Sequence, residues 1–500
     1  MPRAVLLGLA AAGLFIAALD AYVVVTLLPS MIADVGLTID RFEQATPIVT
    51  GFLGGYVVAM PLLGAYSDAR GRIPVYAACM VAFAAGSAIT ATAGLGNLSG
   101  LPWMVAGRVL QGLGGGGLVP LSLALAADLY QDSARTLALG WVAGLQEAGS
   151  VFGPLYGASL AVLAASAGGW RFVFWLNVPL ATLVTAGLVV SARRSPSSAP
   201  SPTVSSVDWI SAALLGLGLG LLVIALYPDD PDHRATSAYL VPAGIASAIL
   251  LVLYGWRQVR RLEPLVPRDL LRSRSFIGAA IANLLIGAAL MVALVDVPVL
   301  GRLVFNLDQL GSGLLLSRFL AGVPVGAVLG GWLAGKVGGR VVAVSGMLVS
   351  TAAFAQMSTW PADELTLNIG PLRQADLALF ICGLGFGIVI APLTAAVLAL
   401  TRDQSHGLAT SLVVLARTMG MLVGLSALTA FGLHRFHQIL GTPVLTGDLK
   451  ARVDQLAKLV AAAFLQEYRE IFTAAAAMCA LAAVVMLLTI NQRLRATAIK

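Results

Sequence analysis

Residues 45–93 read ATPIVTGFLGGYVVAMPLLGAYSDARGRIPVYAACMVAFAAGSAITATA. Two long apolar runs lie on either side of a short polar turn, which extends from Gly64 to Arg72. Each run is close to the roughly 20 apolar residues that an α-helix needs to cross a bilayer. Backbone groups in hydrocarbon must be hydrogen-bonded within their own segment, so these runs are predicted to be membrane-spanning helices joined by a tight turn.

The same alternation of apolar runs and polar breaks continues along the whole chain. Of the 500 residues, 58% are hydrophobic and only 11% are charged. We therefore predict an all-α integral membrane protein with fourteen transmembrane helices. The run after Arg3 continues past Asp20 without a clear cleavage site, so it is interpreted as an uncleaved first span and not as a signal peptide. The predicted spans are residues 4–28, 45–66, 73–93, 102–124, 136–164, 172–192, 208–227, 237–256, 275–300, 310–335, 340–360, 374–398, 408–433 and 468–490.

The distribution of Lys and Arg predicts the orientation. With both termini in the cytoplasm, the cytoplasmic segments hold eighteen of the 31 Lys and Arg residues and the outer segments hold ten. This bias favours a multi-pass protein of the cell inner (plasma) membrane with both termini cytoplasmic. The net charge of +7 then reflects topology, and no nucleic-acid partner is expected. The basic cluster Arg257–Arg274 is either a topology determinant or a site for anionic membrane lipids.

The predicted spans fall into two groups of six with a pair between them. Residues 1–192 are predicted to form an N-terminal six-helix bundle, and residues 275–500 a C-terminal six-helix bundle with a long periplasmic loop at 434–468. Residues 193–274 are predicted to hold a Ser- and Pro-rich linker and an inserted two-helix hairpin with cytoplasmic loops. A duplicated bundle is the plan of a transporter with a central site.

Three short motifs carry the most specific information. The turn after the second span contains Gly64, Asp68, Arg70, Gly71 and Arg72. Span four contains Arg108 followed by Gln111, Gly112 and Gly114, and span five contains Gly149, Gly153, Pro154 and Gly157. Taken alone, the Gly-Pro pair of span five is equally compatible with a simple helix kink, because Gly and Pro are common in membrane helices.

Together these motifs resemble the major facilitator superfamily, and within it the fourteen-helix drug:proton antiporters. The resemblance implies that the Gly64–Arg72 turn is a conformational switch, that Arg108 is the family's buried arginine, and that Gly149–Gly157 is its antiporter motif. The chain departs from the family at Ala69 and Ile73, where basic residues are usual. It implies a fold of two bundles, transport by alternating access, and proton coupling.

The first span and the end of the second span suggest a narrower resemblance. LDAYVVVTLLPSMIADVG at residues 19–36 and Pro61–Gly64 resemble a mycobacterial branch of the family. Members of that branch work with a periplasmic lipoprotein and export triacylglycerol-type lipids as well as drugs. A periplasmic lipoprotein is therefore a possible partner of this chain.

The predicted loop at 434–468 contains a helical pattern. Apolar residues recur at i, i+3, i+4 and i+7 spacing with charged residues between them, which predicts an amphipathic helix that runs into the last span. Such a helix could shield lipid tails outside the membrane or contact a partner; it could also be an ordinary outer hairpin. The apolar residues are Leu449, Val453, Leu456, Val460 and Phe464.

Ionisable residues inside the spans are the candidate proton-coupling sites, because charge in hydrocarbon is costly unless it serves a cavity or a partner. Asp20 and Arg108 are predicted to share one depth, and Glu147 and Arg417 another, the latter pair in opposite halves. A guanidinium beside a carboxyl favours its ionised form, so moving Arg108 away from Asp20 would load a proton. Static structural ion pairs are the alternative. The six residues are Asp20, Arg108, Glu147, Asp296, Arg318 and Arg417.

These observations predict a proton-coupled exporter of hydrophobic substrates, favouring lipids such as triacylglycerols. The alternatives are a multidrug:proton antiporter and a non-transporting membrane scaffold. No metal or cofactor is expected, because the proton gradient supplies the driving force, and a monomer is expected. The chain is not expected to be an enzyme, since it has no His-Glu-x-x-His motif and all four His residues lie outside the apolar runs.

Overall fold

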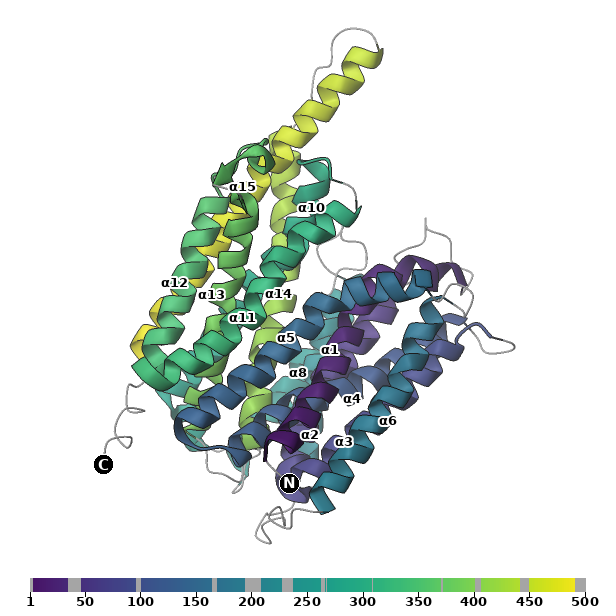
Figure 1. Ribbon diagram of the computed structural model, residues 1–500, viewed down its shortest axis with the longest axis vertical. Helices are drawn as coiled ribbons and strands as arrows, with labels where there is room; N and C mark the ends of the chain where they lie inside the picture. The colour runs from purple at the N-terminus through teal and green to yellow at the C-terminus, as the bar shows by residue number, and fades with distance from the viewer. Residues whose placement is uncertain are drawn as a thin grey trace.

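The computed structural model describes residues 3–34, 46–95, 100–163, 169–193, 208–226, 237–261, 266, 268–307, 309–369, 372–400, 406–440 and 449–490. Long helices account for nearly all of these residues and stand side by side (Figure 1). The helices are α1 (Arg3–Asp34), α2 (Thr46–Arg70), α3 (Arg72–Thr92), α4 (Gly100–Leu129), α5 (Asp132–Leu163), α6 (Trp170–Arg193), α7 (Trp209–Leu226), α8 (Leu240–Arg260), α9 (Arg268–Arg272), α10 (Arg274–Leu303), α11 (Gln309–Val337), α12 (Gly339–Met357), α13 (Gln374–Leu398), α14 (His406–Leu440) and α15 (Leu449–Thr489).

The fold is all-α, as predicted, apart from one short segment between two helices. Between α12 and α13 lie a 3-10 turn, η4 (Glu364–Thr366), and an antiparallel hairpin of β1 (Asn368–Ile369) with β2 (Leu372–Arg373). The hairpin has two residues in each strand, which is too short a signal for sequence periodicity to detect. The chain is otherwise a helical membrane protein, as the sequence predicts.

The number of membrane spans differs from the prediction. Within the described residues, twelve helices are long and apolar enough to cross a membrane, whereas fourteen spans are predicted. The two long helices missing from the twelve are α5 and α14. In both helices, the structure describes only some of the side chains. The described residues of each helix therefore contain no long unbroken apolar segment.

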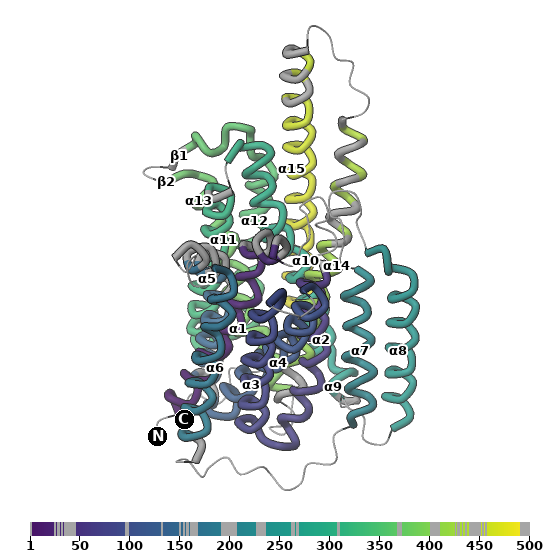
Figure 2. Tube along the Cα trace, turned by 90° about the vertical axis from the view of Figure 1, so that its right-hand side faces the viewer, coloured from purple at the N-terminus to yellow at the C-terminus, as the bar shows by residue number. Residues whose placement is uncertain are grey.

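The helices form two bundles, α1–α6 and α10–α15, and the pair α7 and α8 lies at the side (Figure 2). Helix α7 packs on α2 through Gly216, where an added Cβ would lie 2.8 Å from the carbonyl oxygen of Val58. The hydroxyl of Ser247 on α8 donates a hydrogen bond to the carbonyl of Gly218 on α7 over 2.7 Å. The α7–α8 pair is therefore attached to the outside of the first bundle.

The two bundles meet at the end of the molecule where α1 begins and α15 ends (Figure 1). There α5 and α11 touch through glycines, because a Cβ at Gly140 would lie 2.7 Å from the carbonyl oxygen of Ala327 and one at Gly331 would lie 2.8 Å from that of Thr136. One buried apolar cluster crosses this contact, joining first-bundle residues to Ala391 and others of α13 and α14.

At the opposite end, the first bundle has a core of its own. The buried cluster that contains Val23, Met31 and Trp170 includes, among the described residues, members of the first bundle alone. The bundles diverge in this direction (Figure 1). The molecule is thus closed at the end where α1 begins and separated into two halves at the other end.

The predicted periplasmic loop at 434–468 is largely helical, and this includes the amphipathic helix predicted within it. Residues 434–440 belong to α14, and residues 449–468 belong to α15, a single helix of 41 residues. At 1.5 Å per residue, such a helix is about 60 Å long, twice the roughly 30 Å of a bilayer core. Helix α15 projects beyond the other helices in Figures 1 and 2. The predicted amphipathic helix is therefore the outer part of α15.

Candidate functional site

Asp20 is at the centre of a buried polar network in the first bundle. Its Oδ2 atom accepts hydrogen bonds from Nη1 of Arg108 over 2.8 Å and from Nε2 of Gln111 over 3.0 Å. Its Oδ1 atom accepts one from Nδ2 of Asn177 over 2.7 Å. The side chains come from α1, α4 and α6, and Asp20 and Arg108 are each 1% exposed. Each of these donors favours the ionised carboxylate, whereas burial away from water opposes it.

The Arg108 guanidinium completes the network. Its centre lies 4.3 Å from the ring centroid of Phe52 and 5.9 Å from that of Phe174, close enough for cation–π attraction. Its Nε atom is buried, and no described residue hydrogen-bonds to it. Arg108 is therefore held through one end of its guanidinium, with an unsatisfied donor remaining. The predicted pairing of Asp20 with Arg108 is present in this structure.

Two members of this network were missed by the sequence analysis. Asn177 and Ser87 are 3% and 0% exposed, and Ser87 accepts hydrogen bonds from Gln111 over 2.8 Å and from Asn177 over 3.3 Å. A signal for Asn177 existed, since it is the single Asn in the otherwise apolar run 172–192. Ser87 carries no such signal, because serine is common in membrane helices.

The second ion pair joins the two bundles. Nη2 of Arg417 on α14 donates to Oε1 of Glu147 on α5 over 2.8 Å, and the side chains are 14% and 11% exposed. The hydroxyls of Tyr22 and Tyr56 are close enough to interact electrostatically with Arg417. These two residues, which are predicted to share one depth in opposite halves, are in direct contact.

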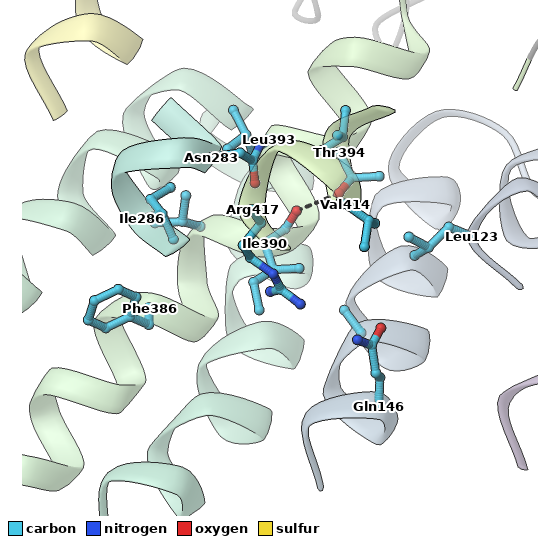
Figure 3. A pocket seen from close by; sticks show the side chains of 13 residues that line it. Leu123, Gln146, Asn283, Ile286, Phe386, Ile390, Leu393, Thr394, Val414 and Arg417 are labelled. Carbon is cyan, nitrogen blue, oxygen red and sulfur yellow. Dashed lines mark hydrogen bonds between the residues drawn. The ribbon is translucent and has the colours of Figure 1, made fainter. Parts of the chain in front are cut away.

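A small cavity lies beside this pair, at the closed side of the molecule. It has a volume of about 20 Å³, enough for roughly one water molecule. Figure 3 shows Arg417 at this cavity with Asn283 and Thr394 on one side and Gln146 from α5 on the other. Residues of both halves thus enclose a water-sized space beside the ion pair.

The remaining two charged candidates lie elsewhere in the second bundle. Nε of Arg318 on α11 lies 3.4 Å from Oδ1 of Asp376 on α13. Asp296 on α10 is a close electrostatic neighbour of Glu467 on α15. Glu467 is 6% exposed, and its Oε2 atom has no hydrogen-bond partner among the described residues. The structure brings neither Asp296 nor Arg318 into the two clusters above, and the sequence analysis missed Glu467 because it placed that residue in a loop.

The predicted switch turn is a compact ion-pair cluster between α2, α3 and α4. Arg72 is paired with Asp68 on the preceding helix, and its Nε atom lies 3.0 Å from Oδ2 of Asp128 at the end of α4. Gly71 has a φ of 92°, which L side chains rarely adopt, so glycine is required at this turn. Gly64 is buried and Arg70 is exposed.

The predicted antiporter motif places α5 directly against α1. A Cβ added at Gly149 would lie 2.7 Å from the carbonyl oxygen of Phe15, and one at Gly153 would lie 2.7 Å from that of Leu19. Larger side chains at either glycine would push α5 away from the helix that carries Asp20. Pro154 and Gly157 belong to α5, and their side-chain surroundings lie outside the described residues.

The outer part of α15 is tied to its neighbours by ion pairs and hydrogen bonds. Nε and Nη2 of Arg435 on α14 bind the two carboxylate oxygens of Glu470 over 2.7 and 2.8 Å. Arg469 donates twice to the carbonyl of Trp360, over 2.7 and 2.9 Å. Of the predicted apolar stripe, Val460 is partly buried and Phe464 stacks on Tyr468 with ring centroids 6.2 Å apart. The side chains of Leu449, Val453 and Leu456 lie outside the described residues.

Two helical bundles that meet at one end and diverge at the other, with ion pairs buried within and between them, are the architecture of an alternating-access membrane transporter. The family model of the Major Facilitator Superfamily matches residues 10–425. The chain therefore belongs to the major facilitator superfamily and is a multi-pass membrane transporter.

Several relatives extend this match over most of the chain. A triacylglyceride transporter of Mycobacteroides abscessus is 40% identical over 440 residues, which cover 87% of this chain and 84% of the relative. A triacylglyceride transporter of Mycobacterium tuberculosis H37Rv is 38% identical over 499 residues, covering 97% and 94%. These relatives are named as transporters, which confirms the prediction that the chain is not an enzyme.

Solved structures share the fold at low sequence identity. The human organic anion transporter MFSD10 has a TM-score of 0.63 at 17% identity and covers 97% of this chain and 100% of its own. The proton:xylose symporter XylE has a TM-score of 0.62 at 16% identity, covering 98% and 96%. At such identities the likeness supports the fold alone.

Proposed function

We propose that this protein exports triacylglycerol-type lipids from the inner membrane toward the periplasm, driven by the proton gradient. The observation that carries the substrate is the identity of 38–40% to proteins named triacylglyceride transporters, over 87–97% of this chain. The long apolar faces of the helices, with few charges inside the bundles, are suited to a substrate that consists mostly of hydrocarbon.

The proposed placement has both termini in the cytoplasm and fourteen membrane spans. Helices α1 and α15 begin and end at the same side of the bundle, as an even number of spans requires (Figure 1). Helices α5 and α14, of 32 and 35 residues, pack among the other spans and are proposed as the thirteenth and fourteenth. The excess of Lys and Arg at this side supports a cytoplasmic location.

In this placement the closed end faces the cytoplasm, so the structure represents an outward-facing state. The Glu147–Arg417 pair, the α5–α11 glycine contacts and the shared apolar cluster hold this end together. Lipid would enter when these contacts open and leave when they close again. The Glu147–Arg417 pair is proposed to stabilise the outward-facing state.

Proton coupling is proposed to use Asp20. In this structure Asp20 is paired with Arg108 and hydrogen-bonded by Gln111 and Asn177, an arrangement that favours the ionised carboxylate. Separation of Arg108 from Asp20 in another conformation would leave a buried carboxylate without its cation, and the carboxyl would take up a proton. Return of Arg108 would release that proton.

The helical projection formed by α14 and α15 is proposed to lie in the periplasm and to guide lipid toward a periplasmic lipoprotein. The Arg435–Glu470 pair and the Arg469–Trp360 contact hold the base of this projection. The transporter is proposed to act as a monomer. The partner can be tested by co-purification with the lipoprotein before and after the outer turns, residues 434–468, are shortened.

A second candidate function is multidrug:proton antiport. The observation in its favour is the Gly149–Gly153 contact of α5 with α1, which occupies the position of the antiporter motif. Both functions need an apolar cavity and a proton site, so they differ in the substrate.

Reconstituted proteoliposomes test the proposal. A fluorescent triacylglycerol and an amphipathic drug are supplied separately, with and without a proton gradient. Gradient-driven, saturable movement of the triacylglycerol supports the proposal, and movement of the drug alone supports the antiporter. Gradient-independent, non-saturable flux would indicate a channel, and no flux of either compound would indicate a scaffold.

A further inference from the structure

A groove lies between α1 and α5 at the end where both helices begin, away from the ion pairs described above. Its volume is about 370 Å³, within the roughly 300–1,000 Å³ typical of ligand sites. The walls come from two stripes with helical spacing, which include Ala4, Gly8 and Ala11 on α1 and Ala134 and Ala138 on α5. Small residues in both stripes keep the helices from filling the space between them.

The space at the centre of the groove is open. A Cβ built at Gly8 meets nothing within 4 Å. The same two helices are in close contact at Gly149 and Gly153, which lie one to two turns beyond the end of the groove on α5. Trp141, another wall residue, is 59% exposed. A tryptophan that is half open on the outer surface of a membrane span faces lipid, so the groove opens toward the bilayer.

Two arginines stand at the beginning of the groove. Arg3 directly precedes Ala4 and is exposed, and Arg135 directly follows Ala134. Nε of Arg135 donates to the carbonyl oxygen of Tyr130, a wall residue, over 3.0 Å. This bond holds the guanidinium at the groove, and its two terminal nitrogens hydrogen-bond to no residue that the structure describes, so they can take another acceptor. Among the described residues, no carboxylate pairs with either arginine, since Asp128 at this end is held by Arg72.

We infer that this groove binds one anionic phospholipid from the leaflet at the closed end, with an acyl chain between α1 and α5 and the phosphate at Arg135 and Arg3. The apolar walls fit the acyl chain of a phospholipid, and the two arginines at the entrance fit its phosphate. Guanidinium groups bind phosphate oxygens through paired hydrogen bonds. A triacylglycerol has no phosphate and would gain nothing from the two arginines. The site is therefore distinct from the route of the transported lipid, and the inference stands whether or not the proposed substrate is correct.

Native mass spectrometry of the full chain tests the inference. The detergent-solubilised protein is titrated with phosphatidylglycerol or with phosphatidylcholine of the same chains. We expect one phosphatidylglycerol to bind at least tenfold more tightly than phosphatidylcholine. Equal affinity for the two lipids would overturn the assignment of the phosphate to the arginines.

Two variants with matched controls locate the site. Gly8→Leu fills the groove, and Arg135→Gln removes the fixed guanidinium; each should weaken phosphatidylglycerol binding at least tenfold. The controls are Gly244→Leu on α8, where an added Cβ also meets nothing within 4 Å, and Arg302→Gln at the opposite end of the molecule. These controls should bind as the unmodified protein does. A loss of binding in the controls as large as in the test variants would contradict the location.

A measurement on the unmodified protein covers the case in which a variant fails to fold. A phosphatidylglycerol with a photoreactive group in its acyl chain is cross-linked in nanodiscs, and the labelled peptides are identified. Labels should concentrate on residues 4–11 and 134–145. Labels spread evenly over the lipid-facing helices, or removal of the label by equimolar triacylglycerol, would each overturn the inference.

Discussion

Arg417 on α14 donates a hydrogen bond to Glu147 on α5 over 2.8 Å, and this contact links the two halves of the transporter next to a cavity of about 20 Å³. Both side chains are largely buried, at 14% and 11% exposure. Removing one member of a buried ion pair leaves an uncompensated charge, which costs roughly 3–5 kcal/mol. Loss of one partner is therefore expected to shift the equilibrium between the inward- and outward-facing states.

We predict that Glu147→Ala and Arg417→Ala each depopulate the outward-facing state and impair export. The double variant removes both charges and should partly restore that state, so the two effects should not add. Spin-label distances across the two halves measure the populations directly. Strictly additive shifts in the inward/outward ratio would show that the contact carries no coupling energy.

Asp20→Asn is predicted to abolish proton-coupled export while the fold is retained. Asparagine has nearly the same shape as aspartate and keeps one acceptor oxygen, but it leaves Arg108 without its anion and cannot take up and release a proton at this position. The measurement is gradient-driven transport in proteoliposomes across a range of pH. Asp363→Asn, an exposed change between α12 and α13, serves as the control and should transport normally. Unchanged transport and unchanged pH dependence in Asp20→Asn would remove Asp20 from the coupling mechanism.

Asp68→Asn is predicted to slow the exchange between inward- and outward-facing states. Arg72 is held by two carboxylates, from Asp68 and Asp128, and loss of one charge weakens the connection between α2, α3 and α4. Single-molecule fluorescence with labels on the two bundles measures the exchange rate. If Asp68→Asn exchanges as fast as the unmodified protein, the turn only caps the helix.

The sequence predicted the features that depend on hydrophobicity and on charge in hydrocarbon. Apolar runs predicted helices, and the high cost of a buried charge pointed to Asp20, Arg108, Glu147 and Arg417, which the structure brings together in two pairs. Depth alone sufficed for this pairing, because all four residues lie on long, regular helices.

Features that depend on contacts between distant segments could not be predicted in the same way. Asn177 and Ser87 are ordinary polar residues until α3 and α6 bring them to Asp20. The apolar pattern of Leu449–Phe464 predicted the helical outer part of α15, whereas the extension of α14 to Leu440, beyond the predicted span 408–433, left no such pattern. Glu467 was overlooked because it was placed in a loop, and the hairpin of β1 and β2 is too short for any periodicity.

Glu364 lies in η4, directly before that hairpin. Its side chain is 1% exposed, and neither carboxylate oxygen has a hydrogen-bond partner among the described residues. Burial raises the pKa of this carboxyl; the nearby Gln356 side chain opposes the rise, and the charge of Asp363 adds a smaller increase. A carboxyl that holds its proton more tightly when folded stabilises the segment below the ordinary pKa of Glu, and this stability is lost as pH rises through the raised value.

Glu364→Gln keeps the shape and removes the charge, so it should stabilise the segment Ser358–Leu367 at pH 8 and have little effect at pH 4. The expected gain at pH 8 is roughly 1 kcal/mol, as for relief of one unsatisfied buried polar group. Amide hydrogen exchange of this segment, compared between the variant and the unmodified protein at each pH, measures the local opening free energy. Equal protection of the two proteins at pH 8 would mean that the Glu364 carboxylate reaches water or a partner when it ionises, and that the segment around η4 does not respond to pH through this residue.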